Sequence, residues 1–156
     1  MAAAALSIVT YNIHKGFSGI NRRFVLPRMR TALADSGADI VFLQEAQGAH
    51  DRHAVRHPAW PQSPQFEFLA DRLWPHFAYG KNAIYDNGHH GNAILSRYPF
   101  NDWENIPVSR YRLPASRSLL HGRLSVPGAS SHLHVICVHF GFLGPERRSQ
   151  IQLLNE

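Results

Sequence analysis

The pattern that most constrains the fold is a strand, a helix and a second strand near the beginning of the chain. The stretch LSIVTYNI (6–13) is rich in strand-forming residues, and DIVFL (39–43) is apolar after its first residue. Between them, apolar residues recur at helical spacing from Phe24 to Asp35, and Gly37 suits the left-handed position that follows a helix. A connection that contains a helix joins parallel strands, so we predict an α/β fold.

The remainder of the chain predicts further elements of the same domain, which we take to cover residues 1–156. A surface loop is expected at 47–64 and a helix at 63–74, with Phe66, Leu69 and Leu73 facing inward. Short apolar runs then predict strands at 76–81, 91–96, 117–125 and 132–140, a loop at 99–116 and a last helix at 145–154. Strands this close together in sequence favour antiparallel pairing.

Composition excludes several classes of protein. The chain is 44% hydrophobic and 17% charged, which excludes an intrinsically disordered protein. Its formal charge of +5 is compatible with a phosphorylated or polyanionic substrate but does not select one. The single cysteine, Cys137, excludes an internal disulfide and fits a reducing compartment. Because neither a signal peptide nor an apolar run of about 18 residues is present, we expect a cytoplasmic protein without a transmembrane segment.

A carboxylate after an apolar strand is the first candidate for chemistry. Glu45 follows DIVFL after a single glutamine. One interpretation is a solvent-facing strand end. Another is the acid that binds a ribose in a dinucleotide fold, but the turn NIHKGFSG lacks the G-x-G-x-x-G spacing which that fold requires. A third is a ligand to Mg²⁺, which prefers oxygen donors and usually takes one or two carboxylates.

Two other polar residues also end predicted strands. Asn12 closes the first strand, where its amide either ties down a turn before Gly16 or meets Glu45 at the edge of the sheet. His139 comes near the end of HLHVICVHF (132–140), on the apolar face of that strand. It is either a satisfied core histidine or a group that projects from the strand end toward Asn12 and Glu45.

Four segments, TYNIHKG, DIVFLQEA, GNAILSRYP and VICVHFG, occur in the order and approximate spacing of the endonuclease/exonuclease/phosphatase superfamily. The chain resembles this superfamily, which includes deoxyribonucleases, sphingomyelinases and inositol phosphatases, and is most similar to its small bacterial members. The resemblance implies a four-layer α/β sandwich of two mixed β-sheets flanked by helices. It also implies a Mg²⁺-dependent phosphoesterase, acting either as a phosphodiesterase or nuclease or as a phosphatase.

The resemblance assigns catalytic roles by position. It implies that Glu45 ligates Mg²⁺, for which Mn²⁺ can substitute. Asn12 would lie beside this metal, as a second ligand or as the group that orients Glu45 or a bound water. His139 would approach the scissile phosphate and stabilise its developing charge. In the implied reaction, water attacks phosphorus in line while the metal polarises a phosphoryl oxygen.

Three further residues are candidates for substrate binding. His90 and Asn92 lie at the start of a strand in GHHGNAILSR, between glycines that allow close backbone approach, and the Arg117 guanidinium matches a phosphate. An ordinary turn or strand role is the alternative for each. The expected partner is a phosphate ester, whether nucleic acid, phospholipid head group or small molecule, and we infer no obligate protein partner.

The sequence departs from the superfamily at its C-terminal end. A GDFN-like motif, which carries the group that activates water, and a DH-like motif follow the histidine strand in the superfamily, and neither occurs here. A complete domain has roughly 250 residues. We therefore expect the C-terminal portion of the domain to be missing and the chain alone to be inactive. The alternative is a non-catalytic fragment or binding module that needs a complementary second half.

Eleven histidines raise the alternative of a zinc site. The segments HDRH (50–53), HHG (89–91) and HLH (132–134), together with His57, could supply nitrogen ligands. None of these segments has H-E-x-x-H or C-x-x-C spacing, so the sequence favours magnesium over zinc.

Overall fold

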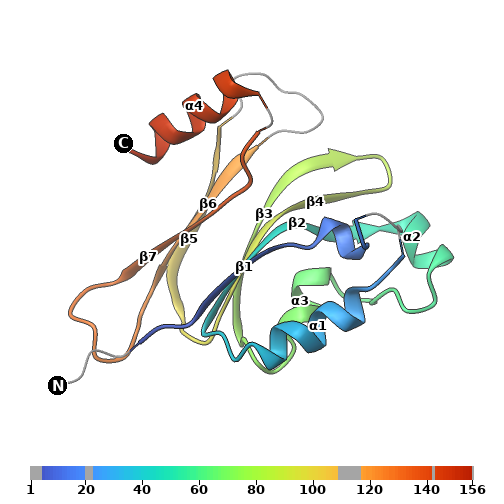
Figure 1. Cartoon of the computed structure of the whole chain (residues 1–156), viewed down its shortest axis with the longest axis horizontal. Coiled ribbons are helices and arrows are strands. Elements are labelled where there is room, and N and C mark those ends of the chain that lie inside the picture. Colours follow the sequence, from blue (N-terminus) through green and yellow to red (C-terminus); the bar gives the residue numbers. More distant parts are fainter. Residues whose placement is uncertain (1–4, 20–22, 109–116, 142, 156) are drawn as a thin grey trace.

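The computed structural model describes residues 5–19, 23–108, 117–141 and 143–155. Its first sheet has the strand order β1-β2-β4-β3, formed by β1 (Ile8–Asn12), β2 (Ile40–His50), β3 (His76–Tyr85) and β4 (Gly88–Ser96). β1 and β2 pair in parallel, whereas β4 pairs antiparallel with both β2 and β3 (Figure 1). The first sheet is therefore mixed, and its parallel pair is the one that the crossover helix predicted.

The second sheet has the order β5-β6-β7 and is antiparallel throughout its described strands, β5 (Phe100–Pro107), β6 (Ser118–Leu124) and β7 (Leu133–Val138). The predicted loop at 99–116 is wrong over β5, while its residues 109–116 lie outside the described part of the chain. β5 is an edge strand that exposes most of its side chains. Hydrogen bonds to β6 stabilise this strand. It lacks the alternating apolar residues by which a strand is predicted, so it could not be detected from the sequence.

Helices follow the strands with some shifts from the predicted ends. They are the single-turn η1 (His14–Gly16), α1 (Leu26–Asp35), α2 (Asp51–Arg56), α3 (Gln65–Ala70) and α4 (Gly144–Leu154). Helix α1 begins at Leu26 rather than Phe24, because Pro27 fits the first helical turn. Helix α3 stops at Ala70, since Asp71 has a left-handed φ of 42°, and Leu73 is therefore exposed rather than inward.

The predicted loop at 47–64 is also partly wrong. Its first residues continue β2, and α2 follows directly at Asp51. The side chain of His50 accepts a hydrogen bond from the backbone N–H of His53 and so caps this short helix. No helix in the described part of the chain is long and apolar enough to cross a membrane.

Helices α1 and α3 cover one face of the first sheet and the second sheet covers the other, and a hydrophobic core lies on each face (Figure 1). One fills the space between this sheet and helices α1 and α3, with the side chains of Leu26, Leu33, Val41, Leu43, Phe66, Leu69, Trp74 and Leu95. The other lies between the two sheets and contains Ile40, Ala78, Ile94, Leu120, Leu124, Val135 and Cys137. The molecule thus has two packed sheets with helices outside, as the sequence predicted.

Candidate active site

Glu45 lies in a bulge of β2 rather than at the predicted strand end. The register of β2 against β4 shifts between Leu43 and Ala46, so that Gln44 and Glu45 lie opposite the single residue Asn92. Glu45 has a left-handed φ of 54°. A bulge of this kind re-aims a side chain without ending the strand. Local backbone geometry, not strand termination, therefore turns the carboxylate out of the sheet.

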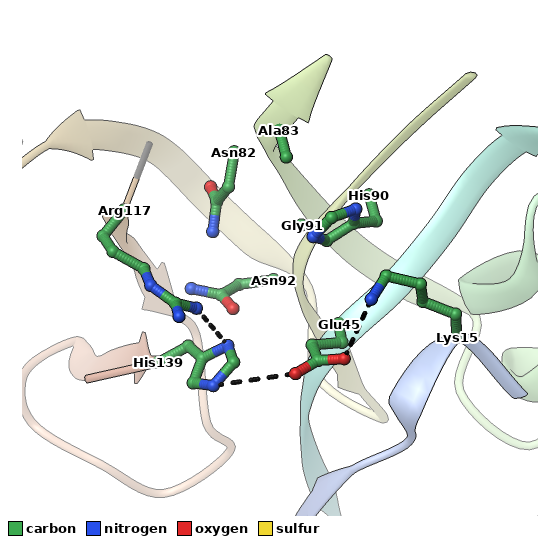
Figure 2. A pocket seen from close by; sticks show the side chains of 9 residues that line it. All are labelled: Lys15, Glu45, Asn82, Ala83, His90, Gly91, Asn92, Arg117 and His139. Atoms are coloured by element: carbon green, nitrogen blue, oxygen red, sulfur yellow. Dashed lines mark hydrogen bonds and ion pairs between the residues drawn. The ribbon is translucent and has the colours of Figure 1, made fainter. Parts of the chain in front are cut away.

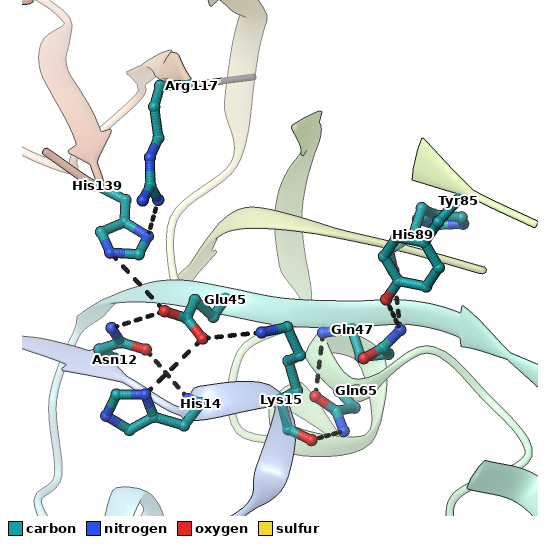
Figure 3. A network of polar contacts seen from close by, with 10 residues as sticks. All are labelled: Asn12, His14, Lys15, Glu45, Gln47, Gln65, Tyr85, His89, Arg117 and His139. Carbon is teal, nitrogen blue, oxygen red and sulfur yellow. Dashed lines mark hydrogen bonds and ion pairs between the residues drawn. The ribbon is translucent and has the colours of Figure 1, made fainter. Parts of the chain in front are cut away.

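Four side chains surround the Glu45 carboxylate (Figure 3). Asn12 Nδ2 donates a hydrogen bond to Oε1 at 3.3 Å, and Lys15 Nζ donates one to Oε2 at 3.2 Å. His139 Nε2 lies 3.8 Å from Oε1, and His14 Nδ1 lies 3.7 Å from Oε2. Burial alone would raise the pKa of Glu45, but Lys15, Asn12 and His139 together lower it below its ordinary value. Glu45 is consequently a carboxylate at neutral pH.

Asn12 is the last residue of β1 and orients this carboxylate. Its Oδ1 accepts a hydrogen bond from the backbone N–H of His14 at 3.1 Å, which leaves its NH₂ group to face Glu45. With its oxygen turned to the backbone, Asn12 acts on Glu45 rather than offering a free acceptor of its own. These contacts are compatible with the orienting role that the resemblance implied, which stays a prediction.

His139 follows the last residue of β7 and is held on two sides. Arg117 Nη1 lies 2.6 Å from His139 Nδ1. Because a guanidinium can only donate, Nδ1 accepts and the ring proton is on Nε2, which faces Glu45. Burial and Arg117 lower the pKa of His139, which favours this neutral form. Gln150 of α4 donates to the His139 carbonyl at 3.4 Å and accepts from the Gly141 N–H at 2.8 Å, so it anchors the backbone.

A cavity of about 230 Å³ opens beside these groups (Figure 2). Its lining consists of Lys15, Glu45, Asn82, Ala83, His90, Gly91, Asn92, Arg117 and His139. All three predicted substrate-binding residues are among them, and they meet the predicted Glu45 and His139. The lining comes from η1, β2, β3 and β4 and from the residues that flank β6 and β7 of the second sheet.

The cavity has more positive than negative groups. Lys15 and Arg117 line it, and Glu45 is the sole carboxylate in that lining. Burial, followed by the charge of Lys15, lowers the pKa of His90 to about 4, so this imidazole is neutral at physiological pH. The resulting excess of positive charge in a partly desolvated hollow favours an anionic ligand.

Two buried polar atoms in the cavity have no hydrogen-bond partner within the described residues: Asn92 Oδ1 and His90 Nδ1. The Asn92 side chain is fully buried, and its NH₂ group donates to the carbonyls of Ser118 and Cys137 at 3.3 and 3.4 Å. Its orientation is therefore fixed, with the oxygen toward Glu45 and His139 (Figure 2). Such an oxygen fits a hard cation or a water bound to one.

Sequence reasoning missed Lys15 and His14 as neighbours of Glu45. They lie in the turn two and three residues after Asn12, where such residues are ordinarily solvated, so their type gave no specific signal. Of the two histidines in GHHG, only His90 lines the cavity. The His89 ring lies 2.9 Å from Tyr79 Oη, because successive side chains of a strand point to opposite faces.

The histidines of the segment 50–57 pack against aromatic rings. His53 stacks on Trp60, His57 stacks on Phe24, and His50 lies against His53. Across the described residues, no three or more His, Cys, Asp or Glu side chains are grouped so that they could hold a metal ion. The histidines of 50–57 thus belong to an aromatic cluster with Phe24 and Trp60.

Comparison with solved structures agrees with this fold. The human Nocturnin catalytic domain with bound sulfate aligns with a TM-score of 0.64 at 14% identity, over 96% of this chain and 58% of that one. An endonuclease/exonuclease/phosphatase from Beutenbergia cavernae aligns with a TM-score of 0.75 at 21% identity, over 96% of this chain and 43% of that one. These likenesses concern the fold.

Sequence comparison identifies the family as well as the fold. The protein YbhP of Escherichia coli K12 is 46% identical over 152 residues, which is 97% of this chain and 60% of YbhP. The chain therefore spans about three-fifths of the length of this relative. The sequence profile of the Endonuclease/Exonuclease/phosphatase family matches residues 9–154, nearly the whole chain. The chain belongs to the Endonuclease/Exonuclease/phosphatase family.

Proposed function

We propose that this chain forms the cation- and phosphate-binding part of a Mg²⁺-dependent phosphoesterase, in which water attacks phosphorus. The proposal rests on the cavity. There one oriented carboxylate, Glu45, lies beside three N–H donors that can bind a phosphate: Lys15, Arg117 and His139. Family membership supports phosphate-ester chemistry of this type. The cavity supports it independently, because its charges fit a metal-bound anion.

Glu45 is the residue that would hold Mg²⁺, or Mn²⁺ in its place. Asn12 orients its carboxylate, and the unpartnered Asn92 Oδ1 offers a second oxygen of the preferred kind. A cation bound there supplies Lewis-acid chemistry, polarising a phosphoryl oxygen and stabilising the leaving oxygen. One carboxylate leaves most of the coordination sphere to water and substrate, as is usual for Mg²⁺.

The donors of the cavity would bind the phosphate itself. His139 presents a neutral Nε2–H, which can donate to a non-bridging oxygen as negative charge develops there. Lys15 adds a flexible ammonium group. Arg117 adds charge to the cavity, although one of its N–H groups is already committed to His139.

The lining residues offer no strong base for the attacking water, since burial lowers the pKa of His90, whose Nδ1 is unpartnered, to about 4. Glu45 is the sole carboxylate of the lining, and the Nδ1 lone pair of His139 accepts from Arg117. We therefore propose that the base comes from outside these 156 residues. Nucleic acids, phospholipid head groups and small phosphate esters all remain substrates of the proposed class, since a shared fold does not choose among them.

The experiment is a combined binding and turnover assay with p-nitrophenyl phosphate. The ³¹P NMR signal of the ester should broaden on addition of the protein with Mg²⁺ and sharpen again with EDTA. His139→Ala should weaken the broadening, because the phosphate loses its neutral donor. Release of p-nitrophenol by residues 1–156 alone should stay below detection, since loss of a base costs about 10²–10⁴ in rate.

Two outcomes would count against the proposal. If broadening is absent, or is unchanged both by EDTA and in His139→Ala, a cation-dependent phosphate site is refuted. Robust Mg²⁺-dependent turnover that is lost in His139→Ala would show instead that the chain carries its own base. A protein that binds the ester without ever turning it over, even with a complementary segment supplied, would be a binding module.

A further inference from the structure

We infer that the Lys15 ammonium exchanges between Glu45 and the substrate phosphate, so that occupation of Glu45 by a cation frees Lys15 to bind substrate. This inference rests on the proposed function and adds a residue and a coupling that the function does not require. The ammonium nitrogen of Lys15 can contact either the carboxylate or a phosphate. Lys15 Nζ lies 3.2 Å from Glu45 Oε2, in the cavity where the cation and the phosphate would bind.

Lys15 and a divalent cation compete for the same carboxylate. Asn12 and His139 lie near Oε1, whereas Lys15 and His14 lie near Oε2. Two unit charges about 4 Å apart interact by roughly 1 kcal/mol even in water, and more strongly in a partly buried site. An ammonium on Oε2 therefore opposes a cation on Glu45, and the opposition is stronger for a double charge.

The backbone of Lys15 is held rigidly while its side chain is not. Its carbonyl accepts a hydrogen bond from Gln65 Nε2 at 2.8 Å, and buried Gln65 is fixed in turn by the Gln47 N–H at 3.0 Å (Figure 3). Lys15 has a left-handed φ of 58°, and the buried Gly16 follows it. The Lys15 side chain remains 36% exposed. Because the Lys15 backbone is fixed and its four-carbon side chain is flexible, the ammonium can change position while the rest of the site stays in place.

If the Lys15 ammonium leaves Glu45, the lining of the cavity offers it no other carboxylate. Apart from Glu45, its lining consists of neutral and cationic side chains, including Arg117 and His139 (Figure 2). Once the charge of Glu45 is shared with a cation, the anion that can pair with Lys15 inside the cavity is the phosphate of the substrate. Lys15 thus opposes the cation but favours the phosphate.

Lys15→Met separates these two effects, because they have opposite signs. Calorimetry should show Mg²⁺ binding about fivefold tighter or better, which corresponds to loss of roughly 1 kcal/mol of repulsion. Inorganic phosphate, titrated at saturating Mg²⁺, should bind about tenfold more weakly, because a charged hydrogen-bond donor is lost. Lys15→Arg keeps the charge and should retain weak Mg²⁺ binding.

The matched control is Lys81→Met, which removes the other lysine of the chain. Lys81 is exposed on β3 and does not line the cavity, so both affinities should stay within about twofold of wild type. Mg²⁺ affinity that is unchanged or lower in Lys15→Met would overturn the exchange. So would equal gains in Lys81→Met, which would reveal a general charge effect.

Failure of the exchange is distinguishable from failure of the proposed function. If wild type binds Mg²⁺ and Glu45→Gln abolishes that binding, the proposed cation site stands whatever Lys15 does. If Glu45→Gln instead leaves Mg²⁺ binding intact, both ideas fail together. Circular dichroism of each variant shows whether it is folded. Should Lys15→Met not fold, Lys15→Gln takes its place with the same expected signs.

Discussion

Left-handed backbone conformations gather at the site. Four non-glycine residues of the described chain have positive φ, and three of them, His14, Lys15 and Glu45, meet around one carboxylate. Such conformations cost about 1–3 kcal/mol each and persist where the surrounding structure holds them. Here the bulge of β2 holds Glu45, and the hydrogen bond from Gln65 holds Lys15. The fold thus maintains strain where it positions charge.

His90 predicts a pH dependence of stability. Its pKa falls from 6.5 to about 4 on folding, mainly through burial. Between these two pH values, His90 is largely protonated in the unfolded chain but neutral in the folded chain. The free energy of unfolding should therefore decrease as pH falls from 6.5 to about 4. Urea titrations across this range should show a shallower pH slope for His90→Gln. The exposed His132→Gln is the control, and equal slopes in wild type and His90→Gln would contradict the assignment.

At the scale of elements, burial decides what the sequence could predict. Strand β7, which has one buried face, and helix α1 with its inward Met29 and Leu33 have the expected period. The exposed strand β5 and the short helix α2 carry no such pattern and were missed. The bulge in β2 was missed as well, because it depends on pairing with β4, and pairing partners are not visible in one strand's sequence.

Five of the six predicted site residues line one cavity, and the sixth, Asn12, contacts Glu45. Most of them lie at the end of a strand or at the bulge of β2. Polar residues at such places were detectable from sequence. Lys15 was not, since a lysine in a turn is ordinarily a solvated surface residue. Its role depends on a left-handed backbone that turns it toward Glu45, and the residue type alone does not encode this conformation.

The contact between β3 and β4 predicts that Gly91→Ala is destabilising. A Cβ at Gly91 would lie 1.8 Å from the Gly80 carbonyl oxygen, so the two strands would have to separate. We expect a loss of about 1–3 kcal/mol in the free energy of unfolding, measured by urea titration. Gly144→Ala, which meets no atom within 4 Å, is the matched control. Equal stability of the two variants would show that the strands adjust freely.

At the scale of the whole molecule, the site exists only where the two sheets meet. Glu45 comes from the first sheet, while Arg117 directly precedes β6 and His139 directly follows β7 of the second. Cys137 links them, since its carbonyl accepts from Asn92 and its Sγ contacts the bulge of β2. Burial raises the pKa of the Cys137 thiol to about 12, which leaves it a packing residue. The core between the sheets therefore also positions the chemistry.

A Mg²⁺ titration followed by backbone-amide NMR tests the central claim most directly. In wild type, Mg²⁺ should shift the amide signals of Glu45 and, across the sheet interface, of His139, and should saturate at concentrations on the order of millimolar because one carboxylate carries the charge. Glu45→Gln should abolish these shifts while leaving the rest of the spectrum intact. Unchanged Mg²⁺ affinity in Glu45→Gln, or shifts confined to residues outside the cavity, would contradict the account.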